Sequence, residues 1–142
     1  MHAQIVKRAL LACFALLFVV AMAGAVQAGP LQFSVSKAQA GGVGQGQQEI
    51  VFHYTVANTT SHEFIRRLNS VTVEVTGDLG NGRQEKYTRE VRINYTFNPA
   101  LGPRMRQGLR SWFHRRIDPR RGWYPYRRVW IRVLRYNFTR AS

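Results

Sequence analysis

Apolar side chains recur at every second residue in separate stretches of the chain. Alternate residues are apolar across 50–56 and across 71–75, with mainly polar residues between them. A period of two places successive side chains on opposite faces of a β-strand, so that one face is buried and the other meets water. This patterning restricts the fold to sheets that bury at least one face.

Further strands and turns are predicted around these two. Residues 31–35 alternate in the same way and form a short first strand, whereas residues 38–48 are rich in Gly, Ala and Gln and are expected to form a mobile loop. Asn81-Gly82 predicts a tight hairpin, because both residues tolerate a positive φ. The returning strand spans 87–97 and is expected to stop at Pro99.

The period changes near the C-terminus. Between 103 and 117, apolar residues fall at the spacing i, i+4, i+7, i+8 and i+12, which predicts one short amphipathic helix built on Met105, Leu109, Trp112, Phe113 and Ile117. A last strand over 129–138 is expected to place Val129, Ile131 and Val133 on one face and Trp130, Leu134, Tyr136 and Phe138 on the other.

About five strands with antiparallel turn signals and one short helix before the last strand predict a small antiparallel β-sandwich. Residues 52–59 (Phe-His-Tyr-Thr-Val-Ala-Asn-Thr), residues 71–75, the turn at Asp78 and the Leu101-Gly102-Pro103 element carry a resemblance. In these residues the chain resembles exported bacterial immunoglobulin-like domains of the FxLYD type, over about half of the mature chain. The resemblance implies a sandwich fold and an interaction role, without a ligand or an activity. An Arg/aromatic-rich insertion at about 99–128 has no counterpart in it.

The N-terminus has the three parts of a signal peptide. Lys7 and Arg8 are followed by an uncharged apolar run over 9–26, and Val26-Gln27-Ala28 is a small-residue cleavage site. A retained membrane anchor is the alternative, but 21–28 is rich in Ala and Gly and no basic cluster follows it. We therefore expect a signal peptide at 1–28 and one β-rich domain at 29–142. The only cysteine, Cys13, lies within the signal, and a disulfide-free exported domain suits a bacterial periplasm or the extracellular space.

Charge is distributed unevenly along the mature chain. Residues 29–98 carry seven basic and six acidic side chains, whereas residues 99–142 carry twelve arginines, one acid and all three tryptophans. Arginine binds phosphate and carboxylate groups in a bidentate manner, and aromatic rings stack on sugars or settle at a membrane interface. This composition predicts a polyanion-binding segment whose candidate residues are Arg115, Arg116, Arg120, Arg121, Arg127, Arg128, Trp112, Trp123 and Tyr124.

Two readings of this segment remain open. In the first, the domain is a non-enzymatic binding module that contacts an anionic envelope partner such as a lipid head group, lipopolysaccharide or an acidic glycan, including peripheral contact with a membrane surface. In the second, it is a structural or assembly subunit that docks an acidic partner protein. The aromatics could also be core residues and the arginines a solvated face. Nucleic acid fits the same chemistry but is not the expected partner of an exported chain.

Residues for catalysis or metal binding do not form a pattern. His53, His62 and His114 have no metal-like spacing, and the glycine-rich residues 41–46 are not followed by the Lys-Ser/Thr of a phosphate-binding loop. We expect no catalytic residue, no metal and no cofactor; an enzyme would need His53 or His62 beside an acid in a concave pocket. The glutamates are expected to pair with nearby Arg and Lys on strand surfaces: Glu49, Glu63, Glu74, Glu85 and Glu90.

Overall fold

The computed structural model describes residues 29–142, so the expected signal peptide and Cys13 lie outside the described residues. Six strands follow one another along the chain: β1 (Leu31–Gly44), β2 (Gln47–Asn58), β3 (Ile65–Gly80), β4 (Arg83–Leu101), β5 (Arg106–Arg116) and β6 (Arg128–Arg140). A single 3-10 turn, η1 (Pro119–Arg121), lies between β5 and β6. In the part of the chain described, this turn is the one helical element.

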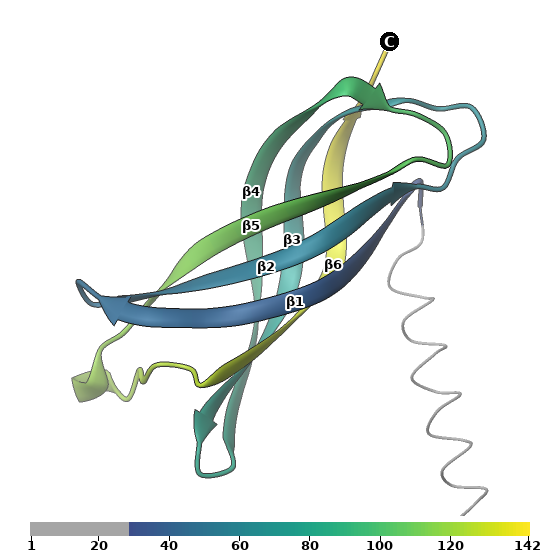
Figure 1. Ribbon diagram of the computed structural model, residues 1–142. Helices are drawn as coiled ribbons and strands as arrows, with labels where there is room; N and C mark the ends of the chain where they lie inside the picture. The colour runs from purple at the N-terminus through teal and green to yellow at the C-terminus, as the bar shows by residue number, and fades with distance from the viewer. Residues whose placement is uncertain (1–28) are drawn as a thin grey trace, which may run out of the picture.

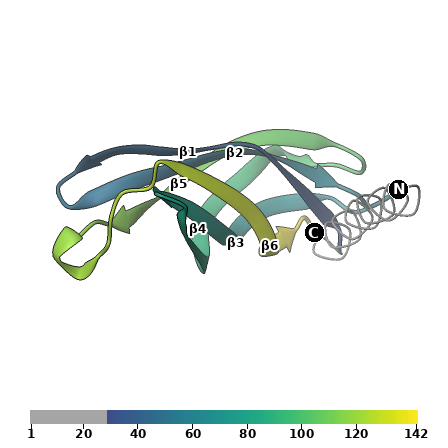
Figure 2. The same cartoon turned by 90° about the horizontal axis from the view of Figure 1, so that it is seen from below.

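The strands form two antiparallel sheets of three strands each. One sheet has the order β1-β2-β5 and the other the order β4-β3-β6. The two sheets cross one another as separate layers, as the two views of the ribbon show (Figures 1 and 2). The prediction of a small, mainly β antiparallel sandwich is confirmed.

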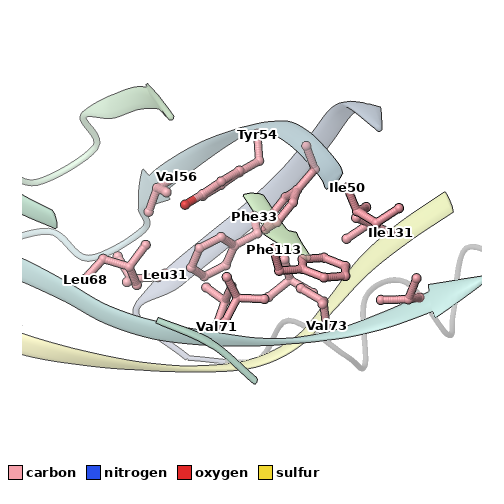
Figure 3. Packing of buried hydrophobic residues seen from close by; sticks show 14 of the residues in the cluster. Leu31, Phe33, Ile50, Tyr54, Val56, Leu68, Val71, Val73, Phe113 and Ile131 are labelled. Atoms are coloured by element: carbon pink, nitrogen blue, oxygen red, sulfur yellow. The ribbon is translucent and has the colours of Figure 1, made fainter. Parts of the chain in front are cut away.

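The core lies between the sheets and is built from the alternating residues. Every second residue of β2 from Ile50 to Val56 is buried, and Val71, Val73 and Val75 of β3 are fully buried opposite them. Side chains from both layers interleave there, with Phe33 of β1 between them (Figure 3). The predicted inner faces of these strands are therefore confirmed.

The β3–β4 hairpin also forms as predicted. Asn81 and Gly82 are its two turn residues, with φ of 55° and 74°, the left-handed values that such a turn requires. The expected stop at Pro99 is wrong, because β4 continues to Leu101, which pairs with Ile65 of β3.

The mobile loop expected at 38–48 is wrong as well. These residues form the end of β1, a turn and the start of β2, and Ala40 pairs with Ile50 while Gly44 pairs with Gln47. β1 is an edge strand held by backbone hydrogen bonds to β2, so it needs no continuous apolar face to form. The low apolar content of this segment therefore did not indicate a loop.

The helix expected at 103–117 is absent, and residues 106–116 form β5. This strand pairs with β2 along its whole length, from Gln47 opposite Arg116 to Ala57 opposite Arg106. Its inner face includes two polar residues, Ser111 and Arg115, and its outer face carries the exposed Trp112. Polar residues inside and an apolar residue outside hide the period of two, which is why the spacing matched a helix.

β6 contains an irregularity that corrects one of its predicted faces. Val129, Ile131 and Val133 point into the core as expected. The register shifts between Val133 and Arg135, so that Tyr136 lies opposite the inward-facing Val71 rather than on the outer face. The Tyr136 ring packs 5.2 Å from that of Phe33, and its hydroxyl accepts a hydrogen bond from the backbone N–H of Leu31. β1 and β6 thus close one side of the sandwich.

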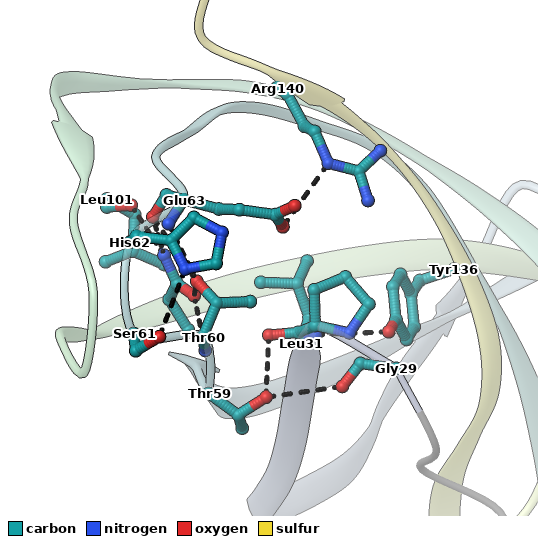
Figure 4. A network of polar contacts seen from close by, with 12 residues as sticks. Gly29, Leu31, Thr59, Thr60, Ser61, His62, Glu63, Leu101, Tyr136 and Arg140 are labelled. Atoms are coloured by element: carbon teal, nitrogen blue, oxygen red, sulfur yellow. Dashed lines mark hydrogen bonds and ion pairs between the residues drawn. The ribbon is translucent and has the colours of Figure 1, made fainter.

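A polar network orders the loops at the end of the domain where β2 finishes. The buried Asn58 donates to the carbonyl oxygens of Glu63 and Leu101 and accepts from Thr60. Figure 4 shows this network beside the Arg140–Glu63 ion pair and the contact between Leu31 and Tyr136. This end of the molecule is rigidly tied and lies away from η1.

Candidate anion-binding surface

Arg115 is the second-last residue of β5, and its side chain faces inward and is buried. Its guanidinium lies 3.1 Å from the Glu85 carboxylate, donates 2.5 Å to the Tyr124 carbonyl oxygen, and sits 3.8 Å from the centre of the Tyr126 ring. The Tyr126 hydroxyl donates to the same Glu85 carboxylate at 2.6 Å. Burial, together with this hydrogen bond to Glu85, raises the pKa of Tyr126 above its usual range. Arg115 therefore anchors the chain and is not free to meet a ligand.

Gln48 of β2 holds the segment after η1 against the sheet. Its buried side-chain amide donates to the carbonyl oxygens of Gly41 and Tyr126, and its side-chain oxygen accepts from the backbone N–H of Tyr126. Ile117 donates in addition to the Gly46 carbonyl oxygen. The basic segment between β5 and β6 is thus fastened at both of its ends.

Between these fastenings the chain forms a closed loop, residues 118–124, which we call the tip loop. Asp118 and Trp123 exchange two backbone hydrogen bonds, of 2.9 and 3.0 Å. The loop lies beside the β1–β2 turn, at the end of the sandwich opposite the C-terminus (Figure 1). Its closure fixes where the side chains of Arg120 and Arg121 emerge.

Trp123 is the centre of an exposed basic and aromatic group. The guanidinium groups of Arg116 and Arg121 lie over its ring, 5.5 and 5.4 Å from the ring centre, and the residue remains 37% exposed. Tyr124, the next residue in the chain, is exposed, and so is Arg120, three residues before Trp123. We call this group the tip surface: Arg116, Arg120, Arg121, Trp123 and Tyr124. An acid, Asp118, lies 3.6 Å from Arg121.

The remaining candidates lie elsewhere. Arg127 and Arg128 are exposed at the start of β6, where with Trp130 they border a hollow of about 390 Å³ against residues 38–40 of β1. Trp112 is 53% exposed on the outer face of β5, with the Arg110 guanidinium 5.4 Å from its ring centre. The structure therefore brings five of the nine candidates together on the surface, buries Arg115 in contact with the Tyr124 carbonyl oxygen, and places the other three elsewhere.

Comparisons of the chain with protein-family models, curated proteins and solved structures give no match. The resemblance to FxLYD-type domains accordingly remains a prediction. Within residues 29–142, no helix is long and apolar enough to cross a membrane.

The histidines and acids of the described domain are exposed or half-buried. His62 contacts Ser61 in the loop before β3, and His114 lies 3.7 Å from Glu49, across the strand pair. No three His, Cys, Asp or Glu side chains come together to hold a metal in the described domain. Ion pairs join Glu63 to Arg140, Glu74 to Lys86 and Arg132, and Glu85 to the buried Arg115. Among the described residues, Glu49 faces His114 instead of an Arg or Lys, and Glu90 forms no ion pair, so the expected pairing holds for three of the five glutamates.

Sequence reasoning missed two basic residues because they lie in the near-neutral half of the chain. Arg89 and Arg92 of β4 border the same hollow as Trp112 of β5. The guanidinium of Arg89 lies 4.9 Å from the Phe113 ring centre and donates to the His114 carbonyl oxygen. The distribution of charge along the chain does not indicate these two arginines, because β4 lies beside β5 only in the folded domain.

Proposed function

We propose that this chain is an exported, non-enzymatic binding module of the cell envelope, and that its tip surface contacts an anionic partner. The chemistry recognised is a phosphate, sulfate or carboxylate group next to a sugar ring or an acyl surface, as in lipid head groups, lipopolysaccharide or acidic glycans. An immunoglobulin-like sandwich would serve as the rigid support.

One observation supports this proposal most directly: Trp123 is exposed with two guanidinium groups over its ring. A flat ring beside fixed cations offers stacking area and charge to the same ligand. Because the bond of Ile117 to Gly46 holds the chain before the loop and Gln48 holds Tyr126 after it, little conformational freedom has to be lost on binding.

The test compares two pairs of adjacent arginines. Arg120→Gln/Arg121→Gln removes two charges from the tip surface, and Arg66→Gln/Arg67→Gln removes two exposed charges from the start of β3, where Ile65 pairs with Arg140 near the C-terminus. Binding to heparin and to phosphatidylglycerol vesicles is measured over a salt series. We expect the tip variant to detach at lower salt and to show a shallower salt dependence, because fewer counterions are displaced.

The two probes separate a glycan from a lipid source of the anion. Equal losses in the two double variants would mean that only net charge matters, and would contradict a tip site. Unchanged binding in the tip variant would contradict it as well. Circular dichroism and thermal unfolding of each variant show whether the fold is retained.

A further inference from the structure

The two sides of the sandwich differ in how they are closed. β1 and β6 close one side through the contacts of Tyr136 with Phe33 and Leu31. On the other side lie β4 and β5, each an edge strand that pairs with one neighbour only, β3 and β2 respectively, among the described strands. We call this second side the open edge.

Two contacts between the sheets bound the open edge. At one end Gln107 of β5 donates to the Tyr95 hydroxyl of β4. At the other end Arg89 of β4 donates to the His114 carbonyl oxygen at 3.2 Å. Between them are two adjoining hollows of about 420 and 500 Å³, which share Arg92 and Trp112.

The floor of the open edge is apolar. Ile93, Tyr95 and Leu109 point toward the core but stay partly exposed, since no further strand covers them in the described domain. A side chain entering here would bury apolar surface against these three residues.

The rim of the open edge is basic. Arg92, Arg110 and His114 line the hollows together with Arg89, and Glu90 is the single acid among the lining residues. The outer face of β5 adds Arg106 and Arg116 at its two ends. An acidic segment would complement this rim.

The backbone of β5 also offers hydrogen bonds at this edge. Alternate residues of an antiparallel strand turn their N–H and C=O groups away from the paired neighbour. Met105 and Ile117 direct backbone groups toward β2 and its turn, whereas the His114 carbonyl faces Arg89 of β4. The even-numbered residues 106–116 therefore turn their backbone groups to the open edge, and their side chains lie on the outer face.

We propose that the open edge accepts an extended segment of an acidic partner protein, which adds as an antiparallel strand beside β5. Acidic side chains of that segment lie on the outer face near Arg110, and apolar side chains enter above Leu109 and Ile93. This site shares only Arg116, at the end of β5, with the tip surface and does not depend on the function proposed for that surface. A second copy of this chain is disfavoured as the occupant, because antiparallel pairing of β5 with β5 sets Arg106 near Arg116 of the copy and like charges would oppose.

The probe is a capped nine-residue peptide that alternates Glu and Val, and its binding to the full domain is measured by fluorescence anisotropy. In antiparallel pairing, residues on the outer face of the added strand direct their N–H groups to β5, so N-methylation at the Glu positions should weaken binding at least tenfold. N-methylation at the Val positions, whose N–H groups face away, should have a much smaller effect. Equal effects of the two patterns would overturn strand addition.

Two substitutions of Gly108 test the same hydrogen bonds from the side of the protein. The N–H of Gly108 faces the open edge, and a Cβ at this position would meet no atom of the described domain within 4 Å. Gly108→Pro should remove one edge donor and weaken peptide binding about tenfold, whereas Gly108→Ala should bind as the parent does. Equal affinity of the proline variant for the peptide would contradict the proposal. If the proline variant fails to fold, the N-methylated peptides still test strand addition on the parent protein.

Three further measurements complete the test. Polyglutamate of equal charge should compete poorly with the peptide. Full competition would mean that the peptide is held by its net charge alone and would contradict strand addition. Arg120→Gln/Arg121→Gln should retain peptide binding, and an equal loss there would move the peptide to the tip surface. Sedimentation should show a monomer, whereas a dimer broken by Gly108→Pro would assign the edge to a second copy.

Discussion

The ring of Tyr126 lies flat against the backbone of Gly77, so close that a Cβ at residue 77 would collide with the ring. Gly77 is a residue of β3, paired with Glu85 on one side and Val129 on the other. The absence of a side chain at Gly77 is what allows the basic segment to dock on the sheet through Tyr126.

Gly77→Ala should therefore destabilise the domain by about 2 kcal/mol, because the ring or the strand must shift to admit a methyl group. Gly108→Ala is the control, since it also replaces a strand glycine but meets open space. It should be neutral or stabilise by about 0.5 kcal/mol. Urea unfolding measures both. Equal stabilities of the two variants would mean that Tyr126 does not pack as described.

Arg115 and Arg116 are adjacent but have different roles, and their stability effects should differ. Arg115→Gln breaks the contacts with Glu85 and Tyr124 and should lower the free energy of unfolding by about 2 kcal/mol. Glu85 is 38% exposed, so water screens part of this interaction. Arg116→Gln should change stability by less than about 0.5 kcal/mol. Thermal and urea unfolding of the two variants check this, and a reversed order would contradict the assignment.

Stability should fall in alkaline solution. Burial raises the pKa of Tyr54, and burial and the bond to Glu85 raise that of Tyr126. Each tyrosine ionises more readily in the unfolded chain, so its contribution to stability is complete below about pH 10 and is lost as the pH rises toward the folded pKa. The expected slope is up to about 1.4 kcal/mol per pH unit for each group.

Urea unfolding at pH 8, 10 and 11 measures this dependence in the parent and in Tyr54→Phe and Tyr126→Phe. Tyr54→Phe also loses the 2.8 Å hydrogen bond with Ser111, so its stability is lower at every pH. The diagnostic is the slope, which should be shallower in each variant. Slopes equal to that of the parent in both variants would rule out the Tyr54 and Tyr126 hydroxyls as its cause.

Trp123→Ala should weaken binding to heparin about fivefold, which corresponds to about 1 kcal/mol for a stacked ring beside cations. Trp130→Ala is the control, because this residue is 48% exposed on the other sheet and lies outside the tip surface. Titrations with intact protein give the two dissociation constants. A larger loss in Trp130→Ala would shift the site toward Arg127 and Arg128.

Strands with an uninterrupted alternation could be predicted from the sequence, and those with polar residues inside could not. From Ile50 to Val56 of β2, and from Val71 to Val75 of β3, the inward side chains are apolar, so the period of two is visible. In β5 the inward Ser111 is paired with the Tyr54 hydroxyl and the inward Arg115 with Glu85. These polar residues are buried because residues distant in the chain provide partners, and no local pattern contains that information.

The candidate site was predicted in its composition but not in its geometry. The basic segment was located by its charge, yet strand alternation buries Arg115 and exposes Arg116. The separation of Trp112 from Trp123 likewise depends on β5 being a strand that ends before the tip loop. Residues such as Arg89 came into view only through the packing of one sheet on the other.

The alternation along β5 makes this strand tolerant of substitutions but not of changes in length. Loss of one residue from its first half, with the tip loop still fastened to Gln48 and Gly46, would leave the residues before the loss one position out of phase. After loss of Arg110, for example, the side chain of Arg106 would turn into the core, and those of Gln107 and Leu109 would turn to solvent. We therefore expect homologous chains to vary freely at the outward positions of β5 while keeping a constant number of residues between the end of β4 and Tyr126.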